Sequence, residues 1–140
     1  MTASTRYTFG TTVAEPIDKV RPRVEAALRT EGFGILTEID VAATLKAKLG
    51  IDRRPYLILG ACNPSLAHAA LEADPSIGAL LPCNVVLRED DPGITTIEVL
   101  DPETALSIAG EPLIAPIASE ARAAEPGRRR DRAARLLTPR

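Results

Sequence analysis

Two cysteines and the only histidine of the chain lie in or near the segment LILGACNPSLAHAALEAD, residues 57 to 74. Cys62 and His68 belong to this segment, and Cys83 follows it. Thiolates and imidazoles are ligands that zinc prefers in proteins. These three side chains therefore predict one alternative, a zinc-like divalent metal site, with Glu38 as a further ligand. Their spacing differs from that of the closely paired CxxC ligands of common structural zinc sites.

A second alternative uses Cys62 as the nucleophile of a thiol-dependent enzyme. A cysteine beside the positive end of a helix can have a lowered pKa, which favours the reactive thiolate. His68 would then act as the base, or Glu38 as the proton carrier. The sequence contains no HExxH, GxSxG, glycine-rich phosphate loop or dinucleotide fingerprint. We therefore lean toward a protein without catalytic activity and leave its cofactors open.

The third alternative, which we favour, is a small-ligand-binding or interaction module without chemistry of its own. Its pocket is predicted where two acidic residues of one strand meet the corner formed by residues 60–63. Gly60 fits this prediction because a glycine in a strand often marks the close approach of a ligand or of another backbone. The predicted ligand-binding residues are Glu38, Asp40, Gly60, Cys62, Asn63 and Asn84. The ligand itself is not identified by these residues.

The Asn63-Pro64 pair also has a purely structural explanation. Asparagine is a preferred N-cap, and proline at the first helical position has no N–H to leave unsatisfied. Cys62 precedes the cap, where an apolar side chain commonly packs against the fourth helical residue, here Ala67. We expect His68 to point away from the apolar face of this helix and to face solvent, a subunit partner or a cleft. That apolar face consists of Leu66, Ala67, Ala70 and Leu71.

The elements around this corner alternate between strands and helices. Apolar runs and period-two patterns predict strands at 5–13, 32–40, 54–62, 78–89 and 94–101. The turn sequence DDPG should join the last two strands into a hairpin. Short helices are predicted at 41–49, from Pro64, and in pieces over 102–124 that Pro112 and Pro116 interrupt.

The helix expected between the first two strands carries a proline inside its apolar pattern. Its buried positions should be Ile17, Val20, Val24, Ala27 and Leu28. Pro22 predicts either a kink or a true start of the helix near Pro22 itself. Gly32 supplies the stop.

Strand alternation predicts which side chains share a face. In the strand at 32–40, one face should carry Phe33, Ile35, Thr37 and Ile39, and the other Leu36, Glu38 and Asp40. Cys83 is expected to be a buried small hydrophobic residue, with Asn84 on the opposite face. The two most apolar strands should be neighbours, so Cys62 and Cys83 should approach each other without forming a disulfide.

The order of the elements predicts an α+β fold. Strands joined first through helices and then by a hairpin favour two layers, with a mixed or antiparallel sheet of about five strands and helices mainly on one face. A chain of 140 residues is expected to form a single domain. We assign that domain to residues 5–124 and a basic, loosely ordered tail to residues 125–140.

Charge and composition limit the partners. Residues 126–140 carry six arginines against Asp131, whereas the rest of the chain is acidic. Nucleic acid is an unlikely partner except through this tail, because 3% aromatic residues and no Trp provide few platforms for stacking bases. The absence of a membrane-span pattern and of signal-peptide features favours the cytoplasm, with reduced cysteines. An edge strand that must be covered predicts a homodimer.

Three ordered blocks carry a resemblance to a known family. GFGILTEID, PYLILGACNPSLAHAAL and IGALLPCNVVL resemble the signature blocks of the bacterial and archaeal domain-of-unknown-function family 302. The resemblance covers roughly residues 5 to 108. It implies a compact α+β domain that pairs into dimers, and it implies no established reaction, substrate or cofactor.

Overall fold

The computed structural model describes residues 4–110 and 114–124, so the predicted basic tail at 125–140 and Pro112 lie outside the described residues. The strands are β1 (Thr8–Val13), β2 (Gly34–Asp40), β3 (Tyr56–Cys62), β4 (Cys83–Asp91) and β5 (Ile94–Leu100). The helices are α1 (Ile17–Thr30), α2 (Val41–Leu49), α3 (Pro64–Ala73), α4 (Pro102–Leu106) and α5 (Ile114–Ala124), with two 3-10 turns, η1 (Pro75–Leu80) and η2 (Ser107–Ala109). No helix among the described residues is long and apolar enough to cross a membrane.

The five strands form one sheet in the order β1-β5-β4-β3-β2. Each neighbouring pair is antiparallel. The α+β class is confirmed, and of the two predicted kinds of sheet, mixed or antiparallel, the sheet is antiparallel. The predicted hairpin is present as β4 and β5, whose turn uses Gly93 at a φ of 76°. That left-handed backbone conformation is accessible to glycine at little cost.

Helix α1 packs on the sheet, and it begins earlier than one alternative predicted. It starts at Ile17 and contains Pro22, so a true start near Pro22 is wrong. A proline inside a helix costs about 3 kcal/mol, whereas fully burying one Val, Leu or Ile side chain contributes about 1.5–3 kcal/mol. All five predicted core positions of α1 are buried, which outweighs the proline: Ile17, Val20, Val24, Ala27 and Leu28. Pro22 itself is exposed on the outer side.

Strand β2 contains a bulge that changes the predicted alternation. The register pairs Ile35 with Ala61 but Thr37 with Gly60, so the strand shifts by one residue between Ile35 and Thr37. An extra residue in one strand moves every following side chain to the other face. Thr37 therefore lies on the opposite face from Ile35, whereas the alternation predicted one shared face for the two residues. The side chain at the bulge, Leu36, is 69% exposed.

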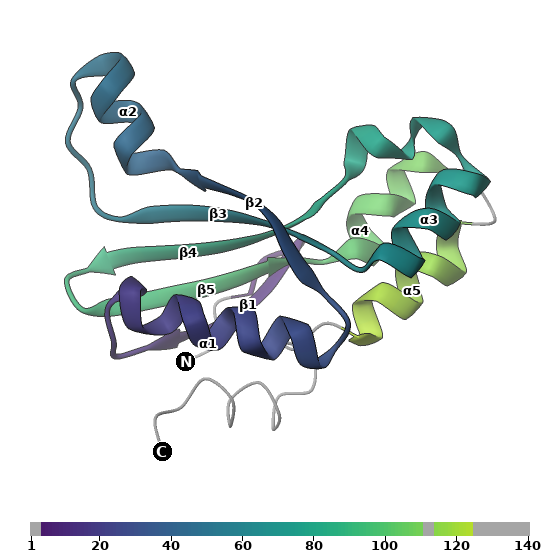
Figure 1. The fold of residues 1–140 in the computed structure, drawn as a ribbon, viewed down its shortest axis with the longest axis horizontal. Helices are drawn as coiled ribbons and strands as arrows, with labels where there is room; N and C mark the ends of the chain where they lie inside the picture. Colours follow the sequence, from purple (N-terminus) through teal and green to yellow (C-terminus); the bar gives the residue numbers. More distant parts are fainter. Residues whose placement is uncertain (1–3, 111–113, 125–140) are drawn as a thin grey trace.

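The buried side chains form two hydrophobic clusters. The sheet cluster joins α1 to the strands and includes Phe33, Leu59 and Ala61. The helix cluster contains Ala70 and Leu106 with side chains from η1 and α5 packed around them. Figure 1 shows α3, α4 and α5 gathered beyond one end of the strands, whereas α2 lies at the opposite end. The molecule thus has two differently built ends, joined by the same strands.

Candidate functional site

The strand-to-helix corner between β3 and α3 is built as the sequence predicts. Asn63 is the N-cap of α3, and its Oδ1 accepts a hydrogen bond of 3.3 Å from the backbone N–H of Leu66. Pro64 occupies the first helical turn. The Nδ2 atom of Asn63 lies against Gly32, where an added Cβ atom would be 3.2 Å away. Asn63 therefore caps α3 and also packs on the turn between α1 and β2.

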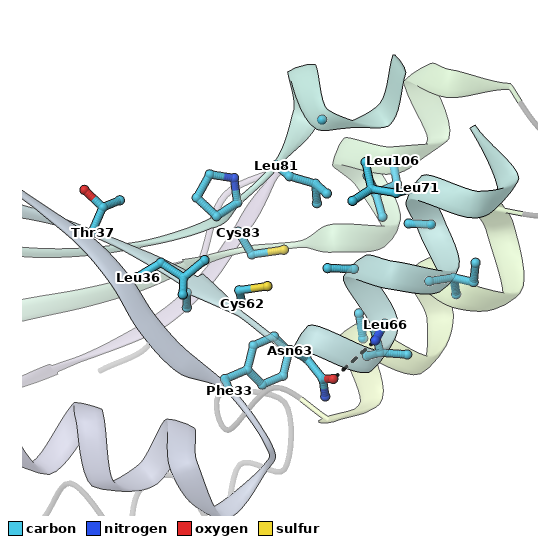
Figure 2. A pocket seen from close by; sticks show the side chains of 17 residues that line it. Phe33, Leu36, Thr37, Cys62, Asn63, Leu66, Leu71, Leu81, Cys83 and Leu106 are labelled. Atoms are coloured by element: carbon cyan, nitrogen blue, oxygen red, sulfur yellow. Dashed lines mark hydrogen bonds between the residues drawn. The ribbon is translucent and has the colours of Figure 1, made fainter. Parts of the chain in front are cut away.

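A pocket of about 400 Å³ opens beside this corner. Figure 2 shows it between the end of the sheet, which contributes Cys62 and Cys83, and the helices that contribute Leu71 and Leu106. Its floor consists of buried residues such as Phe33, and its rim includes the exposed Leu36. The full lining is Phe33, Leu36, Thr37, Ala61, Cys62, Asn63, Leu66, Ala67, Ala70, Leu71, Gly78, Leu81, Pro82, Cys83, Leu106, Ile117 and Ala121.

The pocket is apolar and lacks charge. None of the described residues that line it is Asp, Glu, Lys, Arg or His. Its volume falls within the range of about 300–1,000 Å³ that is typical of small-molecule sites. Such sites are mostly apolar and hold few polar groups. Among the described lining residues, the polar side-chain groups are the Asn63 carboxamide, the Thr37 hydroxyl and two thiols.

The two cysteines lie on neighbouring strands and line the same pocket, as predicted for the strands. Cys83 pairs with Ala61, so Cys62 is one residue away from the position directly opposite Cys83. Both cysteines are free. Burial raises the pKa of the Cys62 thiol above its ordinary value of 9.0. At neutral pH Cys62 is therefore a protonated thiol, which does not favour its proposed role as a nucleophile.

His68 lies away from the thiols. It is exposed on α3, and it is not among the residues that line the pocket, whereas the four residues of the predicted apolar face are. Over residues 4–110 and 114–124, no group of three or more His, Cys, Asp or Glu side chains could hold a metal ion. The structure therefore does not assemble the predicted set of Cys62, His68 and Cys83.

Gly60 lies at a close approach of three chain segments. A Cβ atom at this position would come within 2.6 Å of the Thr37 methyl group and 2.9 Å of Pro82 Cγ. Thr37 and Pro82 both line the pocket, so a side chain on Gly60 would displace part of its wall. Gly60 acts by leaving room for these two neighbours.

The predicted acidic residues lie in a different pocket, of about 740 Å³, near the start of α1 and α2. Glu38 pairs with Arg21 of α1 at 2.9 Å, and its carboxylate raises the pKa of the Arg21 guanidinium. Asp40 is the N-cap of α2 and accepts a hydrogen bond of 2.9 Å from the backbone N–H of Ala43. Asn84 is exposed opposite Gly60 and lines neither pocket. The structure does not bring Glu38, Asp40 or Asn84 into the apolar pocket.

The sequence interpretation missed the far wall of the pocket. These residues lie far along the chain from the corner: Leu81 directly follows η1, Leu106 ends α4, and Ile117 and Ala121 belong to α5. Their apolar spacing on short helices was the available signal, but it predicts burial and not the neighbour that buries it. Only the packing of the helices against the end of the sheet brings these residues opposite Cys62.

Comparisons with known proteins agree with the fold and give no activity. The family model described as "Domain of unknown function DUF302" matches residues 9–125. No curated protein matches the chain. Among solved structures, the chain is similar to the crystal structure of the uncharacterized conserved protein DUF302 from Bacillus stearothermophilus, with a TM-score of 0.76 and 28% identity. That similarity covers 95% of this chain and 97% of the other.

Proposed function

Because the chain belongs to the family of domain of unknown function DUF302, whose description names no reaction, we propose from its geometry that the protein binds a small apolar ligand. The observation that carries this proposal is the pocket of about 400 Å³ beside the Gly60–Asn63 corner. The pocket is open, so water reaches its apolar lining when no ligand is bound. A ligand that covers this lining removes apolar surface from water, which is favourable by about 25 cal/mol per Å².

The chemistry of the lining supports binding and not catalysis. The Asn63 Oδ1 is engaged by the backbone of α3, and burial keeps the Cys62 thiol protonated. None of the described lining residues is His, Asp, Glu, Lys or Tyr, so the two cysteines are the ionisable side chains on the described wall. We propose that binding is the function, with Gly60, Cys62 and Asn63 shaping the site.

1-Aminoanthracene, a small uncharged dye whose fluorescence rises in apolar surroundings, tests this proposal directly. We expect saturable binding by the wild-type protein and weakened binding by Ala67→Leu, because Ala67 lines the pocket and a larger side chain would fill it. Ala69→Leu is the matched control, since Ala69 is exposed on the same helix and does not line the pocket. Equal loss in both variants, or no saturable binding by the wild type, would overturn the proposal.

We also propose that a second copy of the chain covers the β2–α2 arm, residues 39–51. Strand β2 is at the edge of the described sheet, and α2 buries none of its residues. Three large apolar side chains are exposed on this arm: Ile39, Leu49 and Ile51. Open edges and contiguous apolar surface are commonly covered by association, and symmetric dimers are the commonest solution.

Light scattering after size-exclusion chromatography tests the dimer. The wild type should have the mass of a dimer, and Ile39→Lys with Leu49→Lys should convert it to a monomer. Ile108→Lys is the control, because Ile108 is equally apolar and exposed but lies on η2, at the other end of the molecule. A monomer mass for the wild type at high concentration would contradict the proposal.

We propose a cytoplasmic location for the protein, where both free cysteines would stay reduced.

A further inference from the structure

The apolar pocket lies on the boundary between the two hydrophobic clusters. Phe33 and Ala61 on its wall belong to the sheet cluster, whereas Ala70 and Leu106 belong to the helix cluster. The elements α3, η1, α4 and α5 make their most extensive contacts with one another and not with the strands. Figure 1 shows this group beyond the end of the sheet. The pocket therefore separates the sheet cluster from the helix cluster.

The wall also limits the charge of any occupant. Every described lining residue is uncharged, and the Cys62 thiol is protonated at neutral pH. An ionised group that enters such surroundings loses its hydration and gains no counter-charge, which is strongly unfavourable. The predicted acidic residues Glu38 and Asp40 line the other pocket. An uncharged occupant fits this wall, and a charged one does not.

The size of the pocket bounds the occupant as well. A volume of about 400 Å³ corresponds to about 13 water-sized groups at about 30 Å³ each. This is room for a hydrocarbon chain or ring system of roughly that many non-hydrogen atoms. The rim residue Leu36 and the helix residue Leu71 are both exposed, so the pocket has an apolar entrance.

From these observations we infer that the ligand is an uncharged apolar molecule that fills the space between the two clusters and thereby fixes the α3–α5 group against the sheet. This inference rests on the proposed function, which it extends by naming the ligand class and the consequence of binding. The ligand supplies apolar contacts to both sides at once. Binding and the docking of the helices are then coupled, because each is favoured by the same buried contacts.

Hydrogen exchange measures this coupling. Without ligand, the amides of α3 and α4 should exchange faster than those of β4 and β5, because the helices share fewer buried contacts with the sheet. Saturating 1-octanol should slow exchange in α3 and α4 and leave the sheet amides nearly unchanged. Ala67→Leu, which fills the hollow, should slow the same helices without ligand, and Ala69→Leu should not.

A matched series of probes tests the ligand class. Octanol, octanoate and octylammonium have the same chain, and their ability to displace 1-aminoanthracene is measured at pH 8. We expect octanol to bind more than about tenfold more tightly than either ion, because the wall offers no counter-charge. Ala67→Lys should weaken octanol binding strongly, whereas Ala67→Gln, which is of similar size and uncharged, should weaken it less.

The outcomes separate the inference from the function on which it rests. If no probe binds saturably, the proposed function fails and the inference fails with it. If octanoate or octylammonium binds as tightly as octanol, the uncharged ligand class is wrong and the binding function stands. If octanol binds but exchange in α3 and α4 does not change, the coupling to the helices is wrong, while the pocket and its ligand class stand.

Discussion

The two ends of the β2–β3 strand pair face different chemistry. At one end, Asp40 caps α2 and Glu38 pairs with Arg21, so the polar side chains bind parts of the protein itself. At the other end, the strands border an uncharged pocket, and Asn63 caps α3 at its side. The end richer in chemically active side chains thus leaves them occupied. The apolar end retains the unfilled space, and it is the better candidate for a ligand.

The same capping device has a different role at each end. Helix α3 contributes the buried Ala70 to the helix cluster, so its cap supports packing between helices as well as the helix itself. Helix α2 contributes no buried residue, so its cap supports only the helix itself. A hydrogen bond of the same kind therefore affects global stability at the pocket end and local order at the arm end.

The largest expected effect is at Gly60. Gly60→Ala should destabilise the protein by about 1–3 kcal/mol, because the new methyl group would overlap the Thr37 methyl and Pro82. Gly34→Ala on β2 is the control, since an added Cβ atom there meets nothing within 4 Å. Urea unfolding measures both variants. Equal costs would show that close approach at Gly60 is not what requires glycine.

The two caps should separate the two ends. Asn63→Ala should cost about 1 kcal/mol of global stability, whereas Asn63→Asp and Asn63→Ser should stay close to the wild type because both are good caps. Asp40→Ala should leave the urea midpoint nearly unchanged and speed hydrogen exchange in α2 alone. A large loss of stability in both Asn63→Asp and Asn63→Ser would sink the cap assignment. A global loss in Asp40→Ala would remove the contrast between the two helices.

The ion pair at the arm end should contribute less than a cap. A double-mutant cycle of Arg21→Gln and Glu38→Gln should give a coupling energy of about 0.2–1 kcal/mol, because the Arg21 and Glu38 side chains are 27% and 40% exposed. In 1 M salt, where the screening length is about 3 Å, this coupling should fall. Thermal unfolding of the four proteins at two salt concentrations measures it. A larger coupling that resists salt would indicate a functional, desolvated pair in the acidic pocket.

The smallest expected effect on stability comes from the Cys62 thiol. Burial raises its pKa, so the thiol ionises at a lower pH in the unfolded chain than in the folded protein. Its contribution is present in full below the unfolded pKa and is lost as the pH rises through the folded pKa. Cys62→Ala should therefore show a slightly flatter decline of stability at alkaline pH.

The rate of alkylation provides a second measurement of the ionisation of the Cys62 thiol. In a Cys83→Ala background, Cys62 should react slowly with iodoacetamide at pH 7 and faster as the pH rises through the alkaline range. An unfolded sample in urea supplies the reference rate. Rapid, selective alkylation of folded Cys62 at neutral pH would instead revive the thiol-dependent enzyme as an alternative.

Much of the fold follows from local patterns in the sequence. The helix cap at Asn63, the stop of α2 at Gly50 and the β4–β5 turn at Gly93 each depend on a few neighbouring residues, and all three are present. Local pattern does not decide the start of α1, because the local cost of Pro22 opposes a packing gain that depends on the sheet. The bulge at Leu36 was not predicted, since the alternation continues through it without interruption.

The candidate site divides in the same way. The sequence by itself determined the corner, with its capped helix, its apolar face of α3 and its two thiols on neighbouring strands, because propensity, capping and periodicity act over a few residues. The tertiary structure alone decided that Glu38 turns toward Arg21 and that Leu106 and Ile117 face Cys62 across a hollow. The packing of segments distant in the sequence sets these contacts. The pocket is the space left between the sheet cluster and the helix cluster, so no local sequence pattern encodes it.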